Sequence, residues 1–233
     1  MKTHLRLLAA AFGFAFLFGF GLSNASAQLA QMPAKEYIDR MNADERDLKV
    51  DEVIAKLKLK PGDVIADVGS GSGSFTVPFA KAVAPNGIVY AVDIDKDMLS
   101  YVADRGKKAG VTNIKTVLGE FDDPKLPVHD IDVAFFHRVL HMIEHRQLYL
   151  NNTAPYLKKD GRIVIIDKNP EDSPNSWMWL RQTDVDTWMA ALSFYPAEHF
   201  SVFDDRYFVS YQRPYGNSVL LKKRPAGGGG GGN

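Results

Sequence analysis

Residues 64–73 read VIADVGSGSG, and a helix-like stretch follows from about Phe75 to Ala84. A short apolar run bounded by turn residues is typical of a buried strand. Glycines at a strand-to-helix turn let the backbone pass close to a ligand, and the helix N-terminus offers unpaired N–H groups to a carboxylate or phosphate. The stretch therefore predicts a strand, a ligand-binding loop and a helix in that order.

The same alternation continues along the chain. Asp95 is a suitable N-cap for a second helix, which we expect to end near Gly110. Apolar strands that alternate with helices indicate an α/β fold with a mostly parallel sheet and helices on both faces. The expected strands are Val64–Val68, Ile88–Val92, Ile114–Leu118, Ile131–Phe136 and Arg162–Ile166, followed by a helix at Ser176–Phe194 and a closing strand pair at Tyr207–Tyr211 and Ser218–Leu221.

Length and composition favour one globular domain with a packed core. The chain has 233 residues, of which 45% are hydrophobic and 24% are charged; these values are ordinary for a folded domain. The 28 basic and 28 acidic residues balance, which argues against a nucleic-acid partner bound mainly by phosphate neutralisation. The sequence contains no cysteine, which excludes disulfides, thiolate metal sites and a cysteine nucleophile.

The N-terminus has the layout of a secretory signal peptide. Lys2 and Arg6 precede an apolar run from Leu7 to Leu22, and the small-residue site Ala25-Ser26-Ala27 follows. Because the run is shorter than the ~20 residues of a membrane-spanning helix, we expect cleavage rather than an anchor, and a periplasmic or secreted protein. The expected segments are a signal peptide at 1–27, a helical preface at 28–60, the main domain at 61–225 and a flexible glycine-rich tail at 226–233.

A carboxylate at the end of the second expected strand extends the ligand site. Asp93 lies about 24 residues after Gly69, where a carboxylate can accept hydrogen bonds from both hydroxyls of a ribose. A solvated strand-end aspartate is the alternative. The dinucleotide fingerprint G-x-G-x-x-G/A would place Ser74 or Thr76 at its third glycine position, so an NAD-dependent oxidoreductase is disfavoured.

The pattern D-x-G-x-G-x-G at residues 67–73 resembles the first motif of the class I S-adenosylmethionine-dependent methyltransferases. Residues 91–99 are similar to the second motif of that family, 119–127 to its adenine-side segment and 157–165 to its fifth strand with the preceding turn. The turn departs from the family because Lys159-Asp160 stands where proline-glycine is usual. The resemblance implies a Rossmann-like, doubly wound, seven-stranded sheet and S-adenosyl-L-methionine as the cofactor.

The resemblance also implies a role for each residue of the cofactor site. Asp67 would organise the loop near the ammonium group of the cofactor, and Asp93 would hold the ribose hydroxyls. Glu120 would accept from the adenine amino group, while Phe121 would border the base, with a core position of its ring as the alternative. Three loop glycines would flank the methionine part: Gly69, Gly71 and Gly73.

Candidate catalytic residues follow the fourth expected strand. A sulfonium methyl group reacts with a well-placed nucleophile, so orientation can supply most of the catalysis, and a base is needed only where the accepting atom carries a proton of high pKa. His137, His141 and His145 are spaced by four, which predicts a helix that aligns them. We predict His141, and second His137, as the general base. A structural histidine and a three-histidine metal site are the alternatives, and the metal site is disfavoured because no carboxylate partner is evident.

The sequence indicates a small acceptor without identifying it. It lacks the N/D-P-P-Y/F segment of amino-directed nucleic-acid methyltransferases at the fourth strand. We expect methyl transfer to an apolar or aromatic, quinone- or lipid-like molecule, and membrane contact only through the leader. Because the cofactor is made in the cytoplasm, an exported module that binds it without turnover is the alternative. Aromatic residues that could cover the acceptor, or only pack the core, are Trp177, Trp179, Trp188, Phe194 and Tyr195.

Overall fold

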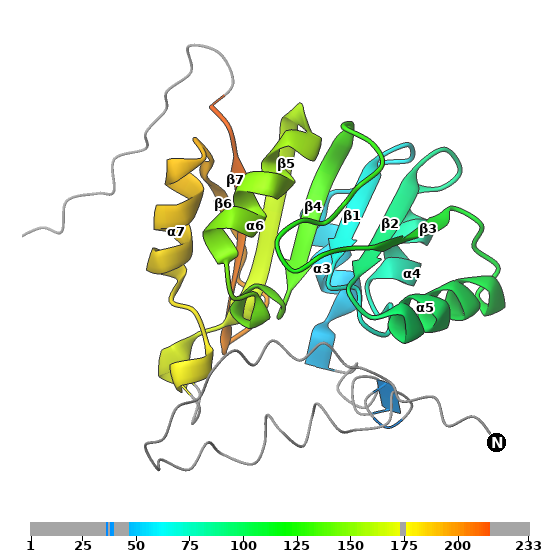
Figure 1. The fold of residues 1–233 in the computed structure, drawn as a ribbon, viewed down its shortest axis with the longest axis horizontal. Coiled ribbons are helices and arrows are strands. Elements are labelled where there is room, and N and C mark those ends of the chain that lie inside the picture. The colour runs from blue at the N-terminus through cyan, green and yellow to red at the C-terminus, as the bar shows by residue number, and fades with distance from the viewer. Residues whose placement is uncertain (1–35, 37, 40–46, 173–175, 215–233) are drawn as a thin grey trace, which may run out of the picture. The chain divides into compact units, whose positions relative to one another are not determined.

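A single mixed sheet organises the computed structural model (Figure 1), which describes residues 36, 38–39, 47–172 and 176–214. Its strands are β1 (Val64–Val68), β2 (Ile88–Asp93), β3 (Ile114–Leu118), β4 (Ile131–His137), β5 (Leu157–Lys168), β6 (Tyr195–His199) and β7 (Arg206–Gln212). They pair in the order β3-β2-β1-β4-β5-β7-β6. The first five strands are parallel, whereas β7 runs antiparallel to both β5 and β6. The prediction of a Rossmann-like, mostly parallel, seven-stranded sheet is confirmed.

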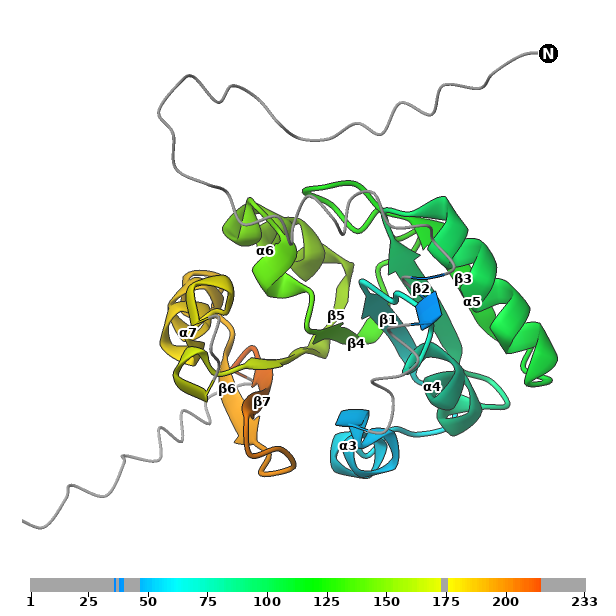
Figure 2. The same cartoon turned by 90° about the horizontal axis from the view of Figure 1, so that it is seen from below.

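Helices cover both faces of this sheet (Figure 2). One face carries α3 (Val50–Leu57), α4 (Thr76–Val83) and α5 (Lys96–Lys108), and the opposite face carries α6 (Arg146–Thr153) and α7 (Gln182–Ala191). Short 3-10 segments are η2 (Leu140–Met142), η3 (Ala154–Tyr156), η4 (Pro170–Asp172) and η5 (Ser176–Met178). Residues 119–130, all of them described, join β3 to β4 without a helix. No helix among the described residues is long and apolar enough to cross a membrane.

Alternation along the strands divides the core into two clusters. Ile163 and Ile165 of β5 pack on the side of α6 and α7, while Val164 and Ile166 pack on the side of α3 and α4. Successive strand residues point to opposite faces, so the central strands are apolar on both sides. This two-sided burial explains why their sequences read as continuous apolar runs rather than alternating ones.

The strand order reverses between β1 and β4, which is the place where ligands bind in open α/β sheets, at the carboxyl ends of the strands. Antiparallel β7 begins at this same edge. Its register opposes Tyr207 to Asp167 and Arg206 to Lys168. The fold therefore brings residues from β1, β2, β4, β5 and β7 to one edge.

The expected helix at Ser176–Phe194 is wrong at both ends. Only Gln182–Ala191 is α-helical, after the 3-10 turn Ser176–Met178. The helix ends because Ser193 adopts a left-handed φ of 60° and the Phe194 N–H donates to Met189 O at 2.9 Å. The chain then enters β6 at Tyr195 instead of continuing the helix.

The expected closing strand pair is also corrected. Tyr207–Tyr211 lies in β7 as expected, but its hairpin partner is β6, at Tyr195–His199. The expected partner Ser218–Leu221 lies outside the described residues. The sheet tolerates Pro196, which has no N–H to donate, because β6 is an edge strand of the described sheet.

Candidate cofactor and acceptor site

The glycine loop connects β1 to α4 through three left-handed residues. Gly69, Gly71 and Gly73 have φ values of 68°, 51° and 79°, a conformation that costs little only for glycine. Space is also limiting, since a Cβ on Gly69 would lie 2.4 Å from Val139 Cγ2. The Gly69 N–H donates to Val92 O at 2.8 Å, which attaches the loop to the end of β2.

Asp67 supports this loop from inside the protein. Its buried carboxylate accepts a hydrogen bond from Thr76 Oγ1, in the first turn of α4, at 2.5 Å. Burial raises the pKa of Asp67 to about 7; the Thr76 hydrogen bond acts in the opposite direction, and the nearby charge of Asp93 adds to the rise. A cation beside a carboxyl group lowers its pKa and favours the carboxylate form. The ammonium group of the cofactor, which is predicted to lie near Asp67, would be such a cation.

Asp93 ends β2 beside the loop, as expected. Its Oδ2 accepts from the Gly71 N–H and its Oδ1 from the Asp95 N–H, each at 3.0 Å. Burial raises the pKa of Asp93 and these backbone hydrogen bonds oppose the rise. Asp95 caps α5, because its Oδ1 accepts from the Asp97 N–H at 2.7 Å. The first two predicted motifs thus form one connected turn.

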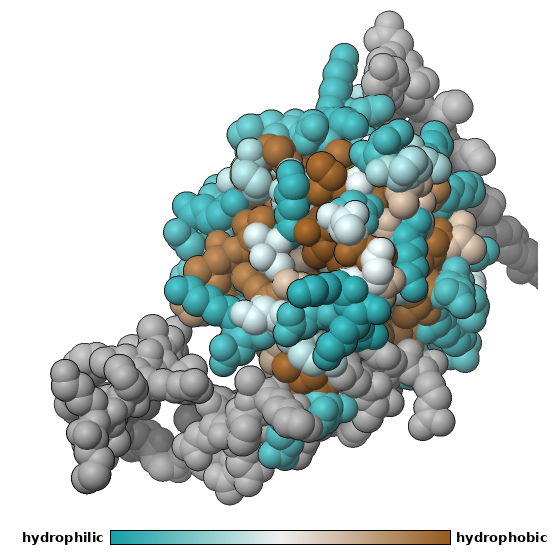
Figure 3. Space-filling model, turned by 90° about the vertical axis from the view of Figure 1, so that its right-hand side faces the viewer, coloured by the Kyte–Doolittle hydropathy of each residue, from teal (hydrophilic) through white to brown (hydrophobic). Residues whose placement is uncertain are grey.

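The segment predicted to contact the adenine base, residues 119–127, is attached to Asp93 by a backbone hydrogen bond. The Gly119 N–H donates to Asp93 O at 3.0 Å, so Glu120 and Phe121 begin the segment just beyond β3. Phe121 is 62% exposed, and the alternative of a core position for its ring is wrong. Glu120 pairs with Lys125 at 3.2 Å on the surface. Hydrophobic and hydrophilic surface alternate on the side of the molecule that bears β3 and α5 (Figure 3).

These residues fit a nucleoside cofactor. Ser70 Oγ is buried and has no hydrogen-bond partner among the described residues, so the loop holds a polar atom free for a ligand. The Asp93 carboxylate and an exposed aromatic ring at Phe121 suit a ribose and a base, respectively. The loop glycines leave the backbone accessible between them.

The three histidines do not share a helix, so that expectation is wrong. His137 ends β4, His141 lies in the 3-10 turn η2, and His145 precedes α6. A left-handed residue, Arg138 with φ 51°, turns the chain directly after β4. Among the described residues, no group of three or more His, Asp or Glu side chains is arranged to hold a metal ion.

His137 lies on the α4 side of the sheet in an aromatic environment. Its ring centroid is 4.9 Å from that of Phe75 and 6.4 Å from that of Phe135. Burial, followed by the charges of Arg138 and Arg206, holds the pKa of His137 well below its ordinary value. Its shielded Nε2 has no partner among the described residues. These surroundings suit a neutral packed ring better than a proton acceptor.

His141 lies instead beside a buried carboxylate at the end of β5. Its Nδ1 is 2.9 Å from Asp167 Oδ2 and 3.1 Å from Oδ1, and the two side chains are only 8% and 0% exposed. A carboxylate at Nδ1 fixes the tautomer with the proton there and leaves Nε2 as the basic nitrogen. The structure therefore favours His141 over His137 as a general base.

Two residues of this region were missed by the sequence reasoning. Asp167, the partner of His141, follows the apolar run of β5 just as Asp67 and Asp93 lie at or next to the last residue of other strands, and that position was its only signal. Tyr207 lies opposite Asp167 in the β5–β7 register. Its buried hydroxyl has no partner among the described residues. No local pattern distinguishes Tyr207 from a core tyrosine.

Trp179 covers the His141 side of the site. The two ring centroids are 4.4 Å apart in an edge-to-face arrangement. Of the five aromatic residues expected to cover an acceptor or pack the core, Phe194 is buried in the core, and Trp177 is exposed. Trp179, another of the five, contacts a predicted catalytic residue.

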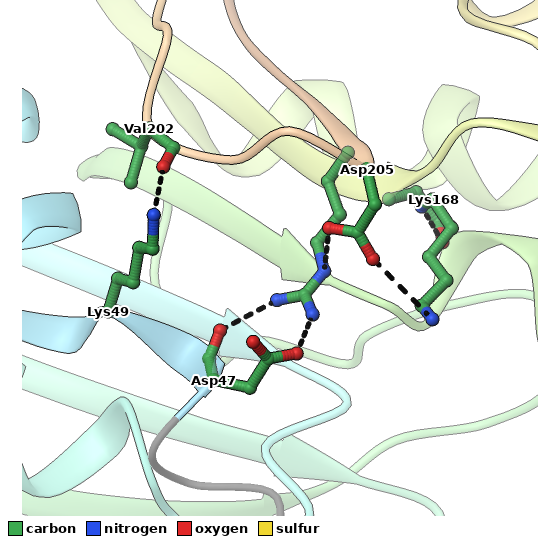
Figure 4. Close-up of polar contacts among 7 residues, drawn as sticks. Asp47, Lys49, Lys168, Val202 and Asp205 are labelled. Carbon is green, nitrogen blue, oxygen red and sulfur yellow. Dashed lines mark hydrogen bonds and ion pairs between the residues drawn. The ribbon is translucent and has the colours of Figure 1, made fainter. Parts of the chain in front are cut away.

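Polar contacts attach Asp47 and Lys49, in the segment before α3, to this edge of the sheet near Val202 and Asp205 (Figure 4). Arg206 makes the central contact. Its buried guanidinium donates to Asp47 O at 2.9 Å, pairs with the Asp47 carboxylate, and lies 3.2 Å from the carboxylate of Asp205. Lys49 Nζ donates to Val202 O at 2.7 Å, and Lys168 lies 3.6 Å from Asp205. The expected N-terminal preface is thus joined to the sheet by charged groups at residues 47–49.

The fold and the site define a class of protein: Rossmann-like α/β domains that bind a nucleoside cofactor at the carboxyl edge of β1 and β2. Within this class, a family described as methyltransferase domain matches residues 59–196, and the chain belongs to that family. The predictions of a class I S-adenosylmethionine-dependent methyltransferase and of its cofactor are confirmed at this level. The alternative of an NAD-dependent oxidoreductase is wrong.

Individual relatives are distant. The chain is 29% identical over 118 residues to nocamycin O-methyltransferase of Saccharothrix syringae, covering 51% of this chain and 42% of the relative. It is 28% identical over 117 residues to a ubiquinone/menaquinone biosynthesis C-methyltransferase of Ectopseudomonas mendocina, covering 50% and 46%. The match thus spans less than half of each relative. A methyltransferase structure from Aquifex aeolicus has the same fold, with a TM-score of 0.69, 21% identity, and coverage of 77% of this chain and 98% of that chain.

We expect Asp93→Ala to weaken S-adenosylhomocysteine binding about 30- to 1,000-fold. Two charge-assisted hydrogen bonds to the ribose would be lost, at ~1.5–3 kcal/mol each and non-additively. Calorimetric titration measures the affinity. Asp95→Ala is the matched control, because it removes the α5 cap, which costs about 1 kcal/mol of stability, and leaves the ribose ligand. Equal affinities of wild type and Asp93→Ala would disprove the ribose role.

The raised pKa of Asp67 predicts pH-dependent binding of S-adenosylhomocysteine. Below about pH 7 the free protein holds a proton on Asp67, which the ligand ammonium must displace, since it favours the carboxylate. The affinity should therefore rise with pH up to about 7 and then level off. Calorimetric titration of S-adenosylhomocysteine at several pH values below and above 7 compares the affinities of wild type and Asp67→Asn. A slope that persists in Asp67→Asn would assign the titration to another group.

Proposed function

We propose that this domain transfers the methyl group of S-adenosylmethionine to a small acceptor, with His141 as general base. The observation that carries the proposal is the buried His141–Asp167 pair at the carboxyl ends of β4 and β5, on the edge that also bears the glycine loop and Asp93. The family match supports the reaction class.

The pair supplies the proton chemistry. With the Asp167 carboxylate at Nδ1, His141 Nε2 can accept the proton of an acceptor hydroxyl or acidic C–H group. The imidazolium that forms is stabilised by Asp167. The electron pair left on the acceptor forms the new bond to the methyl carbon. The cofactor supplies an activated methyl group, whose carbon–sulfur bond breaks with its electrons remaining on sulfur.

The acceptor we propose is aromatic or apolar, and quinone- or lipid-like. Trp179 provides an aromatic surface directly beside the base, and aromatic faces suit flat, delocalised molecules. One of the relatives described above is a ubiquinone/menaquinone biosynthesis C-methyltransferase, which supports a quinone-like acceptor here. The balanced net charge gives no support to a nucleic-acid substrate.

His141→Ala should slow methyl transfer by about 10²–10⁴-fold, the usual loss for a general base. The assay incubates the mature protein with methyl-labelled S-adenosylmethionine and a lipid and quinone extract of the native host. Asp167→Asn should also be slow because the tautomer is no longer fixed. His145→Ala is the matched control, since this histidine is exposed in the same segment.

Two outcomes would change the proposal. A normal rate in His141→Ala would remove the base and leave orientation as the source of catalysis. If the protein binds the cofactor fully but shows no methyl transfer in broad host extracts, the alternative function, an exported cofactor-binding module, would be favoured. The export inferred from the leader favours that alternative, because it separates the protein from the cytoplasmic cofactor supply.

We also propose that the chain is exported to the periplasm or secreted, on the strength of the leader at residues 1–27. Cleavage after Ala27 would make Gln28 the mature N-terminus. N-terminal sequencing of the protein from its native host measures this directly. A chain that still begins at Met1 in the membrane fraction would indicate an uncleaved anchor, and one in the cytosol would refute export.

A further inference from the structure

Arg138 occupies an unusual position at the site. It follows β4 directly and adopts a left-handed φ of 51°, which side chains with a Cβ rarely adopt. Its backbone N–H donates to Ile166 O at 2.9 Å, so β5 holds the turn in place. Strained residues of this kind persist where the surrounding structure fixes them, and they cluster at functional sites.

The Arg138 side chain lies next to the proposed base. Its guanidinium carbon is 5.9 Å from the centre of the Trp179 ring, and the same indole contacts His141, with ring centroids 4.4 Å apart. Arg138 is half-buried at the carboxyl edge of the sheet. One aromatic side chain therefore touches both a cation and the candidate base.

Two carboxylates at this edge of the sheet, Asp167 and Asp205, are committed to other groups. Asp167 accepts from the Lys168 N–H and is paired with His141, while Asp205 pairs with Lys168 and Arg206. Among the described residues, the Arg138 guanidinium has no ion pair or side-chain hydrogen bond; it lies over the Trp179 ring, and its charge acts on His137. Lys168 lies 5.6 Å from the centre of that ring, but it already has an acidic partner. A partly buried guanidinium in this state favours an anionic ligand.

We propose that Arg138 binds the ionised oxygen of the acceptor, a phenolate or enolate, when His141 removes the proton. This inference rests on the proposed function and names the acceptor class of that same site. The acceptor O–H bond breaks, its proton moves to His141 Nε2, and the electron pair stays on the acceptor. Arg138 stabilises the resulting negative charge until oxygen, or the conjugated carbon, takes the methyl group. Planar delocalised anions of this type also suit the Trp179 surface.

The test uses 4-nitrophenol, whose ionised form absorbs visible light, with the wild-type protein saturated with S-adenosylhomocysteine. Titration of the bound probe should show a pKa at least about one unit below that of the free probe, because a cation within ~4–6 Å favours the anion. Arg138→Gln should abolish this shift. Arg138→Lys should retain part of it, since the charge remains and the planar fork is lost.

Matched variants separate Arg138 from its neighbours. Arg181→Gln removes an exposed cation before α7 and should leave the shift unchanged. S-adenosylhomocysteine affinity and circular dichroism report whether each variant is folded. His141→Gln should keep the shift, because the guanidinium and not the base stabilises the bound anion. The charged groups facing this region that the variants leave in place are Asp47, Asp167, Lys168, Asp205 and Arg206.

The outcomes are decisive. A shift lost in Arg138→Gln alone supports the inference. A shift that survives in Arg138→Gln, or a probe that does not bind or does not ionise more readily in the wild-type complex, overturns it. Failure of the proposed function is distinguishable, because it would abolish turnover in host extracts while the spectroscopic shift of the bound probe remained.

Discussion

The parallel pairing of β1 with β2 and β4 is the constraint on which the site depends. Parallel strands end at one edge, so the pairing collects Asp67, Asp93 and His137 there from distant parts of the sequence. The hydrogen bond from Gly71 to the Asp93 carboxylate then fixes the loop of one strand against the end of the next. Antiparallel β7 adds residues to the same edge because it starts where β5 finishes.

Sequence reasoning succeeded where local chemistry determines structure. Asp95 was predicted as an N-cap and does cap α5, and the loop glycines were predicted at a strand-to-helix turn and adopt positive φ. The central strands were found because burial on both faces leaves continuous apolar runs. The same reasoning placed Asp93 at the end of its strand, since this residue directly follows the apolar run in the sequence.

Sequence reasoning failed where contacts between residues far apart in the sequence determine the structure. The four-residue spacing of the histidines predicts a helix, but the left-handed turn at Arg138 and the short η2 segment override that periodicity. β6 was missed because its residues are exposed and include Pro196, so they lack the apolar pattern of a strand. Its strand partner in the described sheet is β7. The His141–Asp167 pair joins residues that only the β4–β5 arrangement brings together.

The attachment of Asp47 to Arg206 affects how far the structural domain extends. The family match begins at residue 59, yet the Arg206 side chain is 1% exposed and donates hydrogen bonds to Asp47. A chain shortened to the family boundary would remove Asp47 and leave Asp205 as the acidic partner of this buried charge, and removing one partner from a buried ion-pair network is destabilising. Sequence families record what relatives share, whereas the contacts at this edge of the sheet include a segment that lies before that shared region.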